Sequence, residues 1–326
     1  MPRSERPAAG AVSSRPESAV PLVNASDVAR VALFLLLVPW AWSLSSRHWP
    51  ALSRLLAGGW AKIRAFKDPR LRTLVSRAVG RRELAVPAPA VWRRTLANNI
   101  EFMLQLLKMS LPSLSRWQPD VDLVGREHIE ECLRQGHGII LWVHRFRPFV
   151  HFVALRKAGF DVCRASGRYH GEFFRSRLGR YWLNPVQNAI EDRYCQRVIV
   201  RDHSFGHLRD LQQRLKRRDI VSMYADHLEG TRNIEVPFLA GRLSLSTQPI
   251  SLAVQNDCRI LPVFPVAEAP GRFLAIVEPG LDIMSESRAA VEEAIARHAR
   301  RLEWYVLRYP DQWHGWWRVR TESGMI

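Results

Sequence analysis

Cysteine is scarce in this chain of 326 residues, and its spacing narrows the kinds of protein that the chain can be. The chain has four cysteines, and neighbouring ones are at least 31 positions apart: Cys132, Cys163, Cys195 and Cys258. This spacing excludes a C-x-x-C zinc or redox motif and the compact disulfide framework of a small secreted domain. We therefore expect the protein to work in a reducing compartment.

Several motifs of common enzyme classes are also absent. Neither G-x-G-x-x-G nor G-x-x-x-x-G-K-[ST] follows a predicted strand, so we expect no nucleotide cofactor. There is no G-x-S-x-G elbow for a serine nucleophile. His203 and His207 have the spacing of two ligands on a helix, but H-E-x-x-H would need a glutamate between them, so no metal site is expected.

Lysine is rare as well, and the charge comes almost entirely from arginine. The chain has 43 Arg and 5 Lys against 31 Asp+Glu, a formal charge of +17, of which +11 falls in the first 112 residues. A basic segment suggests an anionic partner, either nucleic acid or anionic lipid. Without zinc spacing, an RRM motif or basic strands interleaved with aromatic residues, no nucleic-acid partner is expected. The charge therefore favours anionic membrane lipid.

The N-terminal third has the pattern of a membrane-associated module. Residues 1–26 lack apolar periodicity and are predicted to form a flexible tail, followed by a helical segment over residues 27–112. Its first helix, Val31–Leu44, is uncharged and rises roughly 20 Å, against roughly 30 Å for a hydrocarbon core. Because tryptophans cluster at its end and Pro39 lies inside it, we interpret it as an interfacial anchor or a short tilted helix. A signal peptide and an ordinary buried helix are the alternatives.

Two further helical regions complete this segment. Apolar and basic residues alternate over Ala51–Val79, which predicts two basic amphipathic helices separated at Asp68–Pro69. Ala90–Leu111 is a clear amphipathic helix that ends at Pro112.

Residues 113–326 are predicted to form one α/β domain, because apolar periodicity there alternates between that of strands and that of helices. The expected fold is a mixed, largely parallel central sheet flanked by helices. Predicted strands are Val121–Val124, Gly138–Val143, Phe160–Arg164, Arg197–Val200, Ile220–Tyr224, Val236–Leu239, Ile260–Val266 and Phe273–Val277. Predicted helices are Arg126–Gln135, Pro148–Ala158, Phe205–Arg217, Ser246–Asn256 and Ser287–Leu307.

The candidate chemistry lies where strands end. His144 follows the most apolar strand, and Asp226 follows Ile220–Tyr224 in the same topological position, so both could face one cleft. From position alone, a hydrogen-bonded loop histidine and an aspartate that caps a turn are the alternatives. Four arginines at or near strand ends would make a cationic mouth for a phosphate or carboxylate, unless they form a solvated surface: Arg145, Arg147, Arg164 and Arg201.

Five blocks of sequence, in this order, resemble the bacterial lipid A biosynthesis lauroyl/myristoyl acyltransferase family. They are G-I-I-L-W-V-H from Gly138, M-Y-A-D-H around Asp226, E-V-P-F-L-A-G-R-L-S-L-S-T from Glu235, I-L-P-V-F-P-V from Ile260 and R-Y-P-D-Q-W-H-G-W-W-R from Arg308. The resemblance covers about Asp27–Arg320 and implies a membrane-associated acyltransferase. Such an enzyme moves a fatty acyl group from an acyl carrier protein or coenzyme A thioester to a lipid acceptor, without a further cofactor, at the cytoplasmic face of a bacterial inner membrane.

One residue departs from the family pattern H-x-x-x-x-D/E, in which the carboxylate orients the histidine that removes the acceptor proton. Here Phe149 stands at the acid position after His144. Three outcomes are open: a carboxylate from elsewhere, with Asp226 or Glu229 best placed, replaces the acid; His144 acts alone; or the chain has kept only lipid or acyl-carrier binding. The resemblance, with the turn and the helix cap that they provide, also implies that Gly241, Ser246 and Thr247 shape the acyl or donor pocket.

Overall fold

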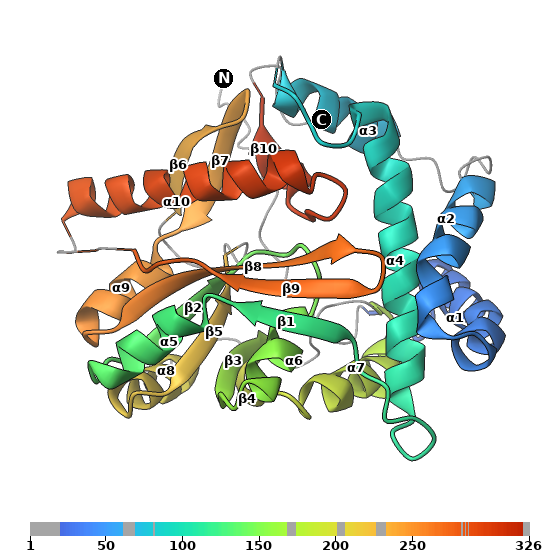
Figure 1. Ribbon diagram of the computed structural model, residues 1–326, viewed down its shortest axis with the longest axis horizontal. Helices are drawn as coiled ribbons and strands as arrows, with labels where there is room; N and C mark the ends of the chain where they lie inside the picture. The colour runs from blue at the N-terminus through green and yellow to red at the C-terminus, as the bar shows by residue number, and fades with distance from the viewer. Residues whose placement is uncertain are drawn as a thin grey trace, which may run out of the picture.

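The computed structural model describes residues 20–60, 69–80, 82–167, 174–200, 206–225, 233–281, 283, 285 and 287–321. It has the α/β fold with an N-terminal apolar helix that the sequence predicts (Figure 1). The strands of the α/β region are β1 (Asp120–Val124), β2 (Ile139–Val143), β3 (Val162–Gly167), β4 (Gln196–Val200), β5 (Ile220–Tyr224), β6 (Asn233–Phe238), β7 (Gly241–Ser246), β8 (Arg259–Ala269), β9 (Arg272–Val277) and β10 (Val319–Arg320). Its helices are α5 (Arg126–Arg134), α6 (Val150–Lys157), η5 (Gly179–Leu183), α7 (Asn184–Glu191), α8 (Gly206–Lys216), α9 (Gln248–Gln255), α10 (Arg288–Arg308) and η6 (Trp316–Arg318).

The central sheet has seven strands in the order β1-β9-β8-β2-β5-β3-β4. β8, β2, β5, β3 and β4 run parallel to one another. β9 pairs antiparallel with β8, and β1 pairs parallel with β9, so β1 and β9 run opposite to the other five strands. β2 lies at the centre, between β8 and β5, and all five of its residues are buried. This position explains its continuous apolar sequence, since a central parallel strand is covered on both faces.

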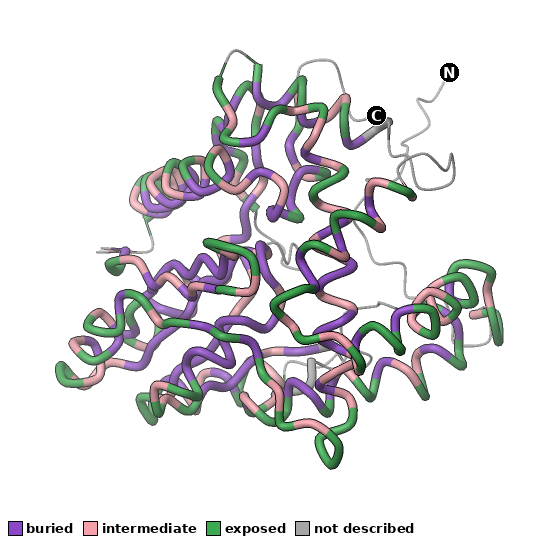
Figure 2. The backbone as a smooth tube through the Cα atoms, turned by 45° about the vertical axis from the view of Figure 1, so that its right-hand side comes forward, coloured by how far each residue is buried: buried purple, intermediate pink, exposed green. Residues whose placement is uncertain are grey.

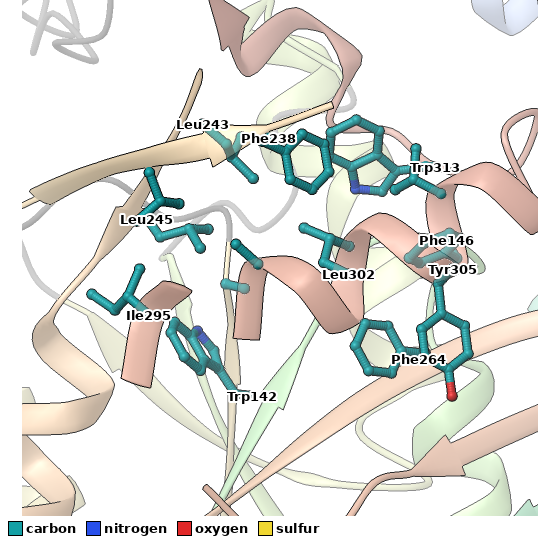
Figure 3. Packing of buried hydrophobic residues seen from close by; sticks show 14 of the residues in the cluster. Trp142, Phe146, Phe238, Leu243, Leu245, Phe264, Ile295, Leu302, Tyr305 and Trp313 are labelled. Carbon is teal, nitrogen blue, oxygen red and sulfur yellow. The ribbon is translucent and has the colours of Figure 1, made fainter. Parts of the chain in front are cut away.

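A smaller antiparallel sheet, β10-β7-β6, lies on the other side of α10 (Figure 1). α10 is therefore sandwiched between two sheets. Figure 3 shows Ile295 and Leu302 of α10 between Trp142 of β2 and Leu243 of β7. This packing makes α10 a core helix, although its sequence is rich in arginine.

The N-terminal segment folds into four helices, α1 (Ala25–Ser43), α2 (Trp49–Trp60), α3 (Pro69–Val79) and α4 (Ala88–Ser110), with a short η2 (Ser46–His48) between the first two. Leu37 and Ala41 of α1 are buried with Ile100 and Leu104 of α4. Most other residues of α1 are exposed or half-buried, and Figure 2 colours the backbone tube green and pink at such residues. Among the described helices, α1 has the length and composition to cross a membrane, a test that soluble core helices and signal sequences also pass.

Most predicted elements match the structure within a few residues. α1 begins at Ala25, before the predicted start at Val31, so the last two residues of the predicted flexible tail are helical. Three further features differ. Residues 184–191 form α7 after a π-helical turn, in a region where no element was predicted. Gly241–Ser246 forms a strand, β7, which was not predicted and which lies between the expected turn at Ala240–Gly241 and the expected helix start at Ser246–Thr247. The predicted strand Phe160–Arg164 begins later, because Phe160 and Asp161 belong to the turn after α6.

Candidate functional site

His144 lies at the carboxyl end of β2, where the sequence placed it. The pleat of β2 sends Trp142 toward α10 and Val143 toward the opposite face of the sheet. His144 follows this alternation and packs on the α10 side, with its ring stacked on Phe264 at 5.4 Å between centroids. Its backbone N–H donates to the carbonyl of Val263, so β8 holds it in place.

His298 of α10 is the partner that the sequence did not reveal. Its Nε2 lies 2.6 Å from Nε2 of His144, and its ring stacks on Trp142 at 3.9 Å. Both histidines are buried, at 3% and 0% exposure. Burial, with the neighbouring His144 and Arg301, holds the pKa of His298 well below its usual value. His298 is therefore a neutral ring at physiological pH.

The short contact requires one of the two rings to donate a proton. If His298 accepts, His144 carries its proton on Nε2 and presents the lone pair of Nδ1, which can act as a base. If His298 donates, its Nε2–H binds the lone pair of Nε2 of His144, and the proton of His144 is on Nδ1. In both cases Nδ1 of His298 is buried and has no hydrogen-bond partner. The tautomer of this pair thus decides which nitrogen of His144 carries the proton.

The end of β5 lies beside the end of β2, which His144 follows, in agreement with the expectation that the ends of these two strands face the same side. Val143 pairs with Tyr224, and the N–H of Ala225 donates to the carbonyl of Val143 at 2.8 Å. The next residue is Asp226, which lies outside the described residues, as do Glu229 and Arg201. The chain therefore enters the segment that contains Asp226 directly next to the histidine.

Arg145 and Arg147 follow His144 but have different environments. Arg145 is half-buried, with its guanidinium 5.0 Å from the centre of the Tyr224 ring. Arg147 is buried and donates to Glu101 at 3.2 Å and to the side chain of Asn98 at 2.9 Å, both on α4. Desolvation lowers the pKa of Arg147, while Glu101 and Asp311 act in the opposite direction. Arg147 therefore fastens α4 to the loop after β2.

Arg164, a predicted anion binder, is enclosed in the protein at 1% exposure. Its guanidinium lies 2.8 Å from the carboxylate of Glu191 on α7. His151 and Ser222 complete this polar cluster, with Ser222 Oγ 3.4 Å from Nε2 of His151. An external anion would have to compete with Glu191 for Arg164, and it would have to enter the core to do so.

The three residues that the resemblance assigned to the acyl or donor pocket lie around β7. Gly241 closes the β6–β7 turn, and a Cβ there would approach the carbonyl oxygen of Arg320 in β10 to 2.3 Å. Ser246 is buried, and its Oγ accepts from the N–H of Gln248 at 3.2 Å. Thr247 occupies the N-cap position of α9, but its side chain makes no capping hydrogen bond. These contacts give all three residues a role in the local backbone.

Phe149 occupies the position where the family pattern has an acid. Its backbone is left-handed, with φ of 48°, at the N-cap of α6. The side chain is buried at 1% exposure and packs against Phe102 at 5.7 Å, in the core on the side of the sheet that Val143 faces. A carboxylate at this position would lie in an apolar environment.

Two surface cavities of about 440 Å³ lie away from this site. One borders β3 and β4 and includes Asp161 and Tyr194, and the other lies between Leu281 and Arg301 of α10. Neither is lined by His144 or His298. Among the residues that the structure describes, no cluster of three or more histidine, cysteine, aspartate or glutamate side chains could hold a metal ion.

The model of the family described as bacterial lipid A biosynthesis acyltransferase matches residues 30–320 of the chain. The chain belongs to this family. Membership supports acyltransferase chemistry, and it agrees with the resemblance seen in the sequence blocks. Comparison with curated proteins gave no match.

Sequence reasoning missed three residues that hold this site together. His298 lies in the run A-R-H-A-R-R, which has the appearance of a solvated helix face. Glu101 is a single acid within α4, and Glu191 stands next to Asp192 at the end of α7, so neither is marked out by a local motif. The one available signal was helical spacing, since His298 lies three and four residues from Ile295 and Leu302 on the apolar face of α10.

Proposed function

We propose that this protein transfers a fatty acyl group from an acyl carrier protein or coenzyme A thioester to a hydroxyl or amine of a lipid acceptor, with His144 as the general base. The observation that carries the proposal is the position of His144 at the carboxyl end of the central strand, buried and held against His298. Carboxyl ends of parallel strands are where α/β sheets place reactive groups.

In the proposed reaction the acceptor oxygen attacks the thioester carbonyl carbon while a nitrogen of His144 takes the hydroxyl proton. The carbon–sulfur bond then breaks, and the imidazolium returns its proton to the leaving thiolate. In this role His298 accepts from Nε2–H of His144 and leaves Nδ1 as the base. The neutral His298 would replace the missing carboxylate in fixing the tautomer, although it supplies no negative charge to stabilise the imidazolium.

The membrane setting is part of the proposal. The open apolar face of α1 and the basic N-terminal segment favour attachment to anionic lipid, with the catalytic domain on the cytoplasmic face of a bacterial inner membrane. A lipid acceptor and a water-soluble thioester donor would meet at such a surface. Asp226, Arg201 and Arg145 are the residues at or after strand ends that we propose for contact with the reacting groups or with anionic parts of the substrates.

One observation favours a second candidate, a membrane-bound protein that binds lipid or acyl carrier without transfer. Phe149 fills the acid position and packs into the core, so the orienting carboxylate of the family pattern is missing at that place. If His298 donates to His144, Nε2 of His144 is blocked and the pair has only a structural role. The two candidates thus correspond to opposite directions of the hydrogen bond between His144 and His298, each with its own tautomer of His144.

The test is to incubate the detergent-solubilised full-length protein with acyl carrier protein and coenzyme A thioesters and a bacterial lipid extract, and to follow free thiol and acylated lipid by mass spectrometry. We expect acylated product with the unchanged protein and none with His144→Ala. A matched control is His48→Ala, which removes an exposed histidine. Product formation that His144→Ala does not reduce would eliminate His144 as the base. Retention of lipid or carrier without product would establish the second candidate.

A further inference from the structure

The helix α1 presents an apolar surface that the rest of the protein leaves uncovered. Val28, Leu35, Leu36 and Trp40 are 54%, 67%, 66% and 45% exposed. They lie on the side of α1 away from Leu37 and Ala41, which pack in the core that α1 shares with α4. Aliphatic and indole side chains at this density are unusual on a surface in water.

A second exposed apolar segment lies in the α/β domain, about 150 residues further along the chain. It consists of Leu178, Tyr181, Trp182 and Val186, from the π-helical turn η5 and the start of α7. Trp182 is 75% exposed, the highest exposure among the large apolar side chains described. We call these four residues the 178–186 surface.

Hydrogen bonds join this segment to the N-terminal end of α1. The N–H groups of Arg177 and Leu178 donate to the carbonyls of Pro21 and Leu22, at 2.9 and 3.1 Å. The carboxylate of Asp27 accepts from the backbone N–H groups of Arg175 and Ser176. Desolvation raises the pKa of Asp27, but its hydrogen bonds to Ser176 and Arg175 and the charge of Arg30 outweigh this, so the pKa is lowered overall.

The close packing between α1 and the segment before η5 also explains why residue 179 is a glycine. A Cβ on Gly179 would lie 2.4 Å from the Cβ of Phe174 and 2.9 Å from the carboxylate of Asp27. The ring of Phe174 in turn lies 6.2 Å from the ring of Phe34 of α1. The start of α1 and the segment that carries the 178–186 surface therefore belong to one packed unit.

The charges around this unit indicate which partner it fits. Arg175 and Arg177 are exposed and Arg180 is half-exposed, beside Leu178, Tyr181 and Trp182. Tryptophan and tyrosine at the level of lipid headgroups, with arginine next to them, are typical of proteins that lie in the interface of an anionic bilayer. Near such a surface each arginine adds electrostatic attraction to the anionic headgroups.

The packing of α1 argues for contact along the surface of the bilayer. α1 is fastened to α4, which carries exposed Arg93 and Arg94, and the same core includes Trp49 and Ala57 of α2. If α1 crossed the hydrocarbon as packed here, parts of α2 and α4 with their charges would enter it too. An orientation in which α1 lies in the interface keeps these charges in water.

We propose that the 178–186 surface is a second membrane-docking element, which inserts with the open face of α1 into the headgroup region of an anionic phospholipid bilayer. This extends the proposed membrane attachment from the N-terminal helix to the α/β domain. It fixes the orientation of that domain relative to the lipid, and it does not depend on acyl transfer.

The buried cysteines allow a direct test. All four are free and buried, so a cysteine introduced by Trp182→Cys is expected to react selectively with the environment-sensitive dye NBD under native conditions. The matched control is Trp317→Cys, at a tryptophan that is 54% exposed on η6. Each labelled full-length protein is mixed with vesicles of equimolar phosphatidylglycerol and phosphatidylcholine, and binding is checked by sedimentation.

We expect NBD emission at position 182 to shift to the blue and to increase when the protein binds, while emission at position 317 stays unchanged. An unchanged spectrum at position 182 on vesicle-bound protein would overturn the proposal, because the protein would then be held by α1 alone. A blue shift at position 182 that grows with protein concentration without vesicles would overturn it too, since it would assign the surface to a second copy of the chain.

Affinity gives an independent measurement. The double variant Leu178→Ser/Trp182→Ser is expected to bind these vesicles at least about tenfold more weakly, because it removes two apolar side chains from the interface. Trp304→Ser, at a tryptophan that is 55% exposed on α10, is expected to bind like the unchanged protein. Equal affinities of the double variant and the control would contradict the proposal. Neither measurement uses enzymatic activity, so failure of the proposed function would leave this result interpretable.

Discussion

The Nε2 atoms of His144 and His298 lie 2.6 Å apart in the interior, although the two residues are 154 positions apart in the sequence. One comes from the end of the central strand and the other from a helix that crosses the sheet. Trp142 and Phe264 stack against the two rings and limit their rotation. The pair is therefore a preorganised unit, in which the proton on His144 depends on a ring from another element.

This relationship gives the first prediction. His298→Leu removes the acceptor, so we expect kcat for acyl transfer to fall about 100-fold or more while KM changes little. His298→Gln places a carbonyl oxygen near the former Nε2 and is expected to restore a large part of the loss. The measurement is steady-state kinetics of both variants, with thermal unfolding as the check on folding. A stable Leu variant with unchanged kcat would limit His298 to a packing role.

The buried pair of Arg147 and Glu101 gives a prediction on stability. Glu101→Gln leaves the guanidinium of Arg147 buried without its charged partner, so we expect a loss of about 3 kcal/mol in the free energy of unfolding. The double variant Glu101→Leu/Arg147→Met removes both charges and is expected to recover most of this loss. Urea unfolding of the single and double variants measures the effect. No recovery in the double variant would show that Arg147 does more than hold α4.

His151 gives a prediction on pH. Desolvation lowers its pKa to about 3, with Arg164 acting in the same direction and Glu191 opposing both, whereas the unfolded chain has the ordinary value of 6.5. Below pH 6.5, His151 therefore binds a proton in the unfolded state but stays neutral in the folded state until the pH approaches 3. This contribution to stability is complete above pH 6.5 and is lost as the pH falls toward 3, by about 1.4 kcal/mol per pH unit.

We thus expect the unchanged protein to lose about 2 kcal/mol more than His151→Gln when the pH falls from about 7.5 to about 5. The free energy of unfolding in urea at the two pH values gives the comparison. His48→Gln serves as control, because it makes the same substitution at an exposed histidine. Parallel pH profiles for the unchanged protein and His151→Gln would mean that His151 is not the group responsible.

Gly241 gives a prediction on the small sheet. Gly241→Ala would push a methyl group toward the carbonyl oxygen of Arg320, so the β7–β10 pairing must shift. We expect a loss of about 1–3 kcal/mol in the free energy of unfolding. Gly58→Ala in α2 is the control, since no atom lies within 4 Å of its added Cβ, and it should be neutral or slightly stabilising. Equal melting temperatures for the two variants would refute this account of Gly241.

Local pattern was sufficient for most elements of the α/β domain. The apolar run Gly138–Val143 could only be a buried strand, and β2 covers Ile139–Val143 of it. The helices α4 and α10 begin and end within two residues of the predicted bounds. These predictions succeeded because apolar periodicity reports which face of an element avoids water, and that face is a property of the sequence itself.

β7 shows where local pattern was insufficient. Gly241–Ser246 alternates arginine or serine with leucine, but its glycine and serines favour a turn when it is considered alone. Pairing with β6 on one side and β10 on the other makes it a strand. The residues of β10 follow about 75 positions later, so no short window of sequence contains the information.

For the candidate site, too, some features could be predicted from the sequence and others could be seen only in the structure. The sequence by itself determined that His144 follows the most apolar strand and that Asp226 follows another strand, because the α/β alternation marks where each strand ends. The structure added that these strands, β2 and β5, are neighbours. Only the tertiary structure decided that His298 faces His144, that Glu191 pairs with Arg164 and that Asp27 binds the backbone just before the 178–186 surface. Each of these contacts joins residues from separate elements, and its geometry exists only after the elements pack, since hydrogen bonds and ion pairs depend on distances that the order of residues does not contain.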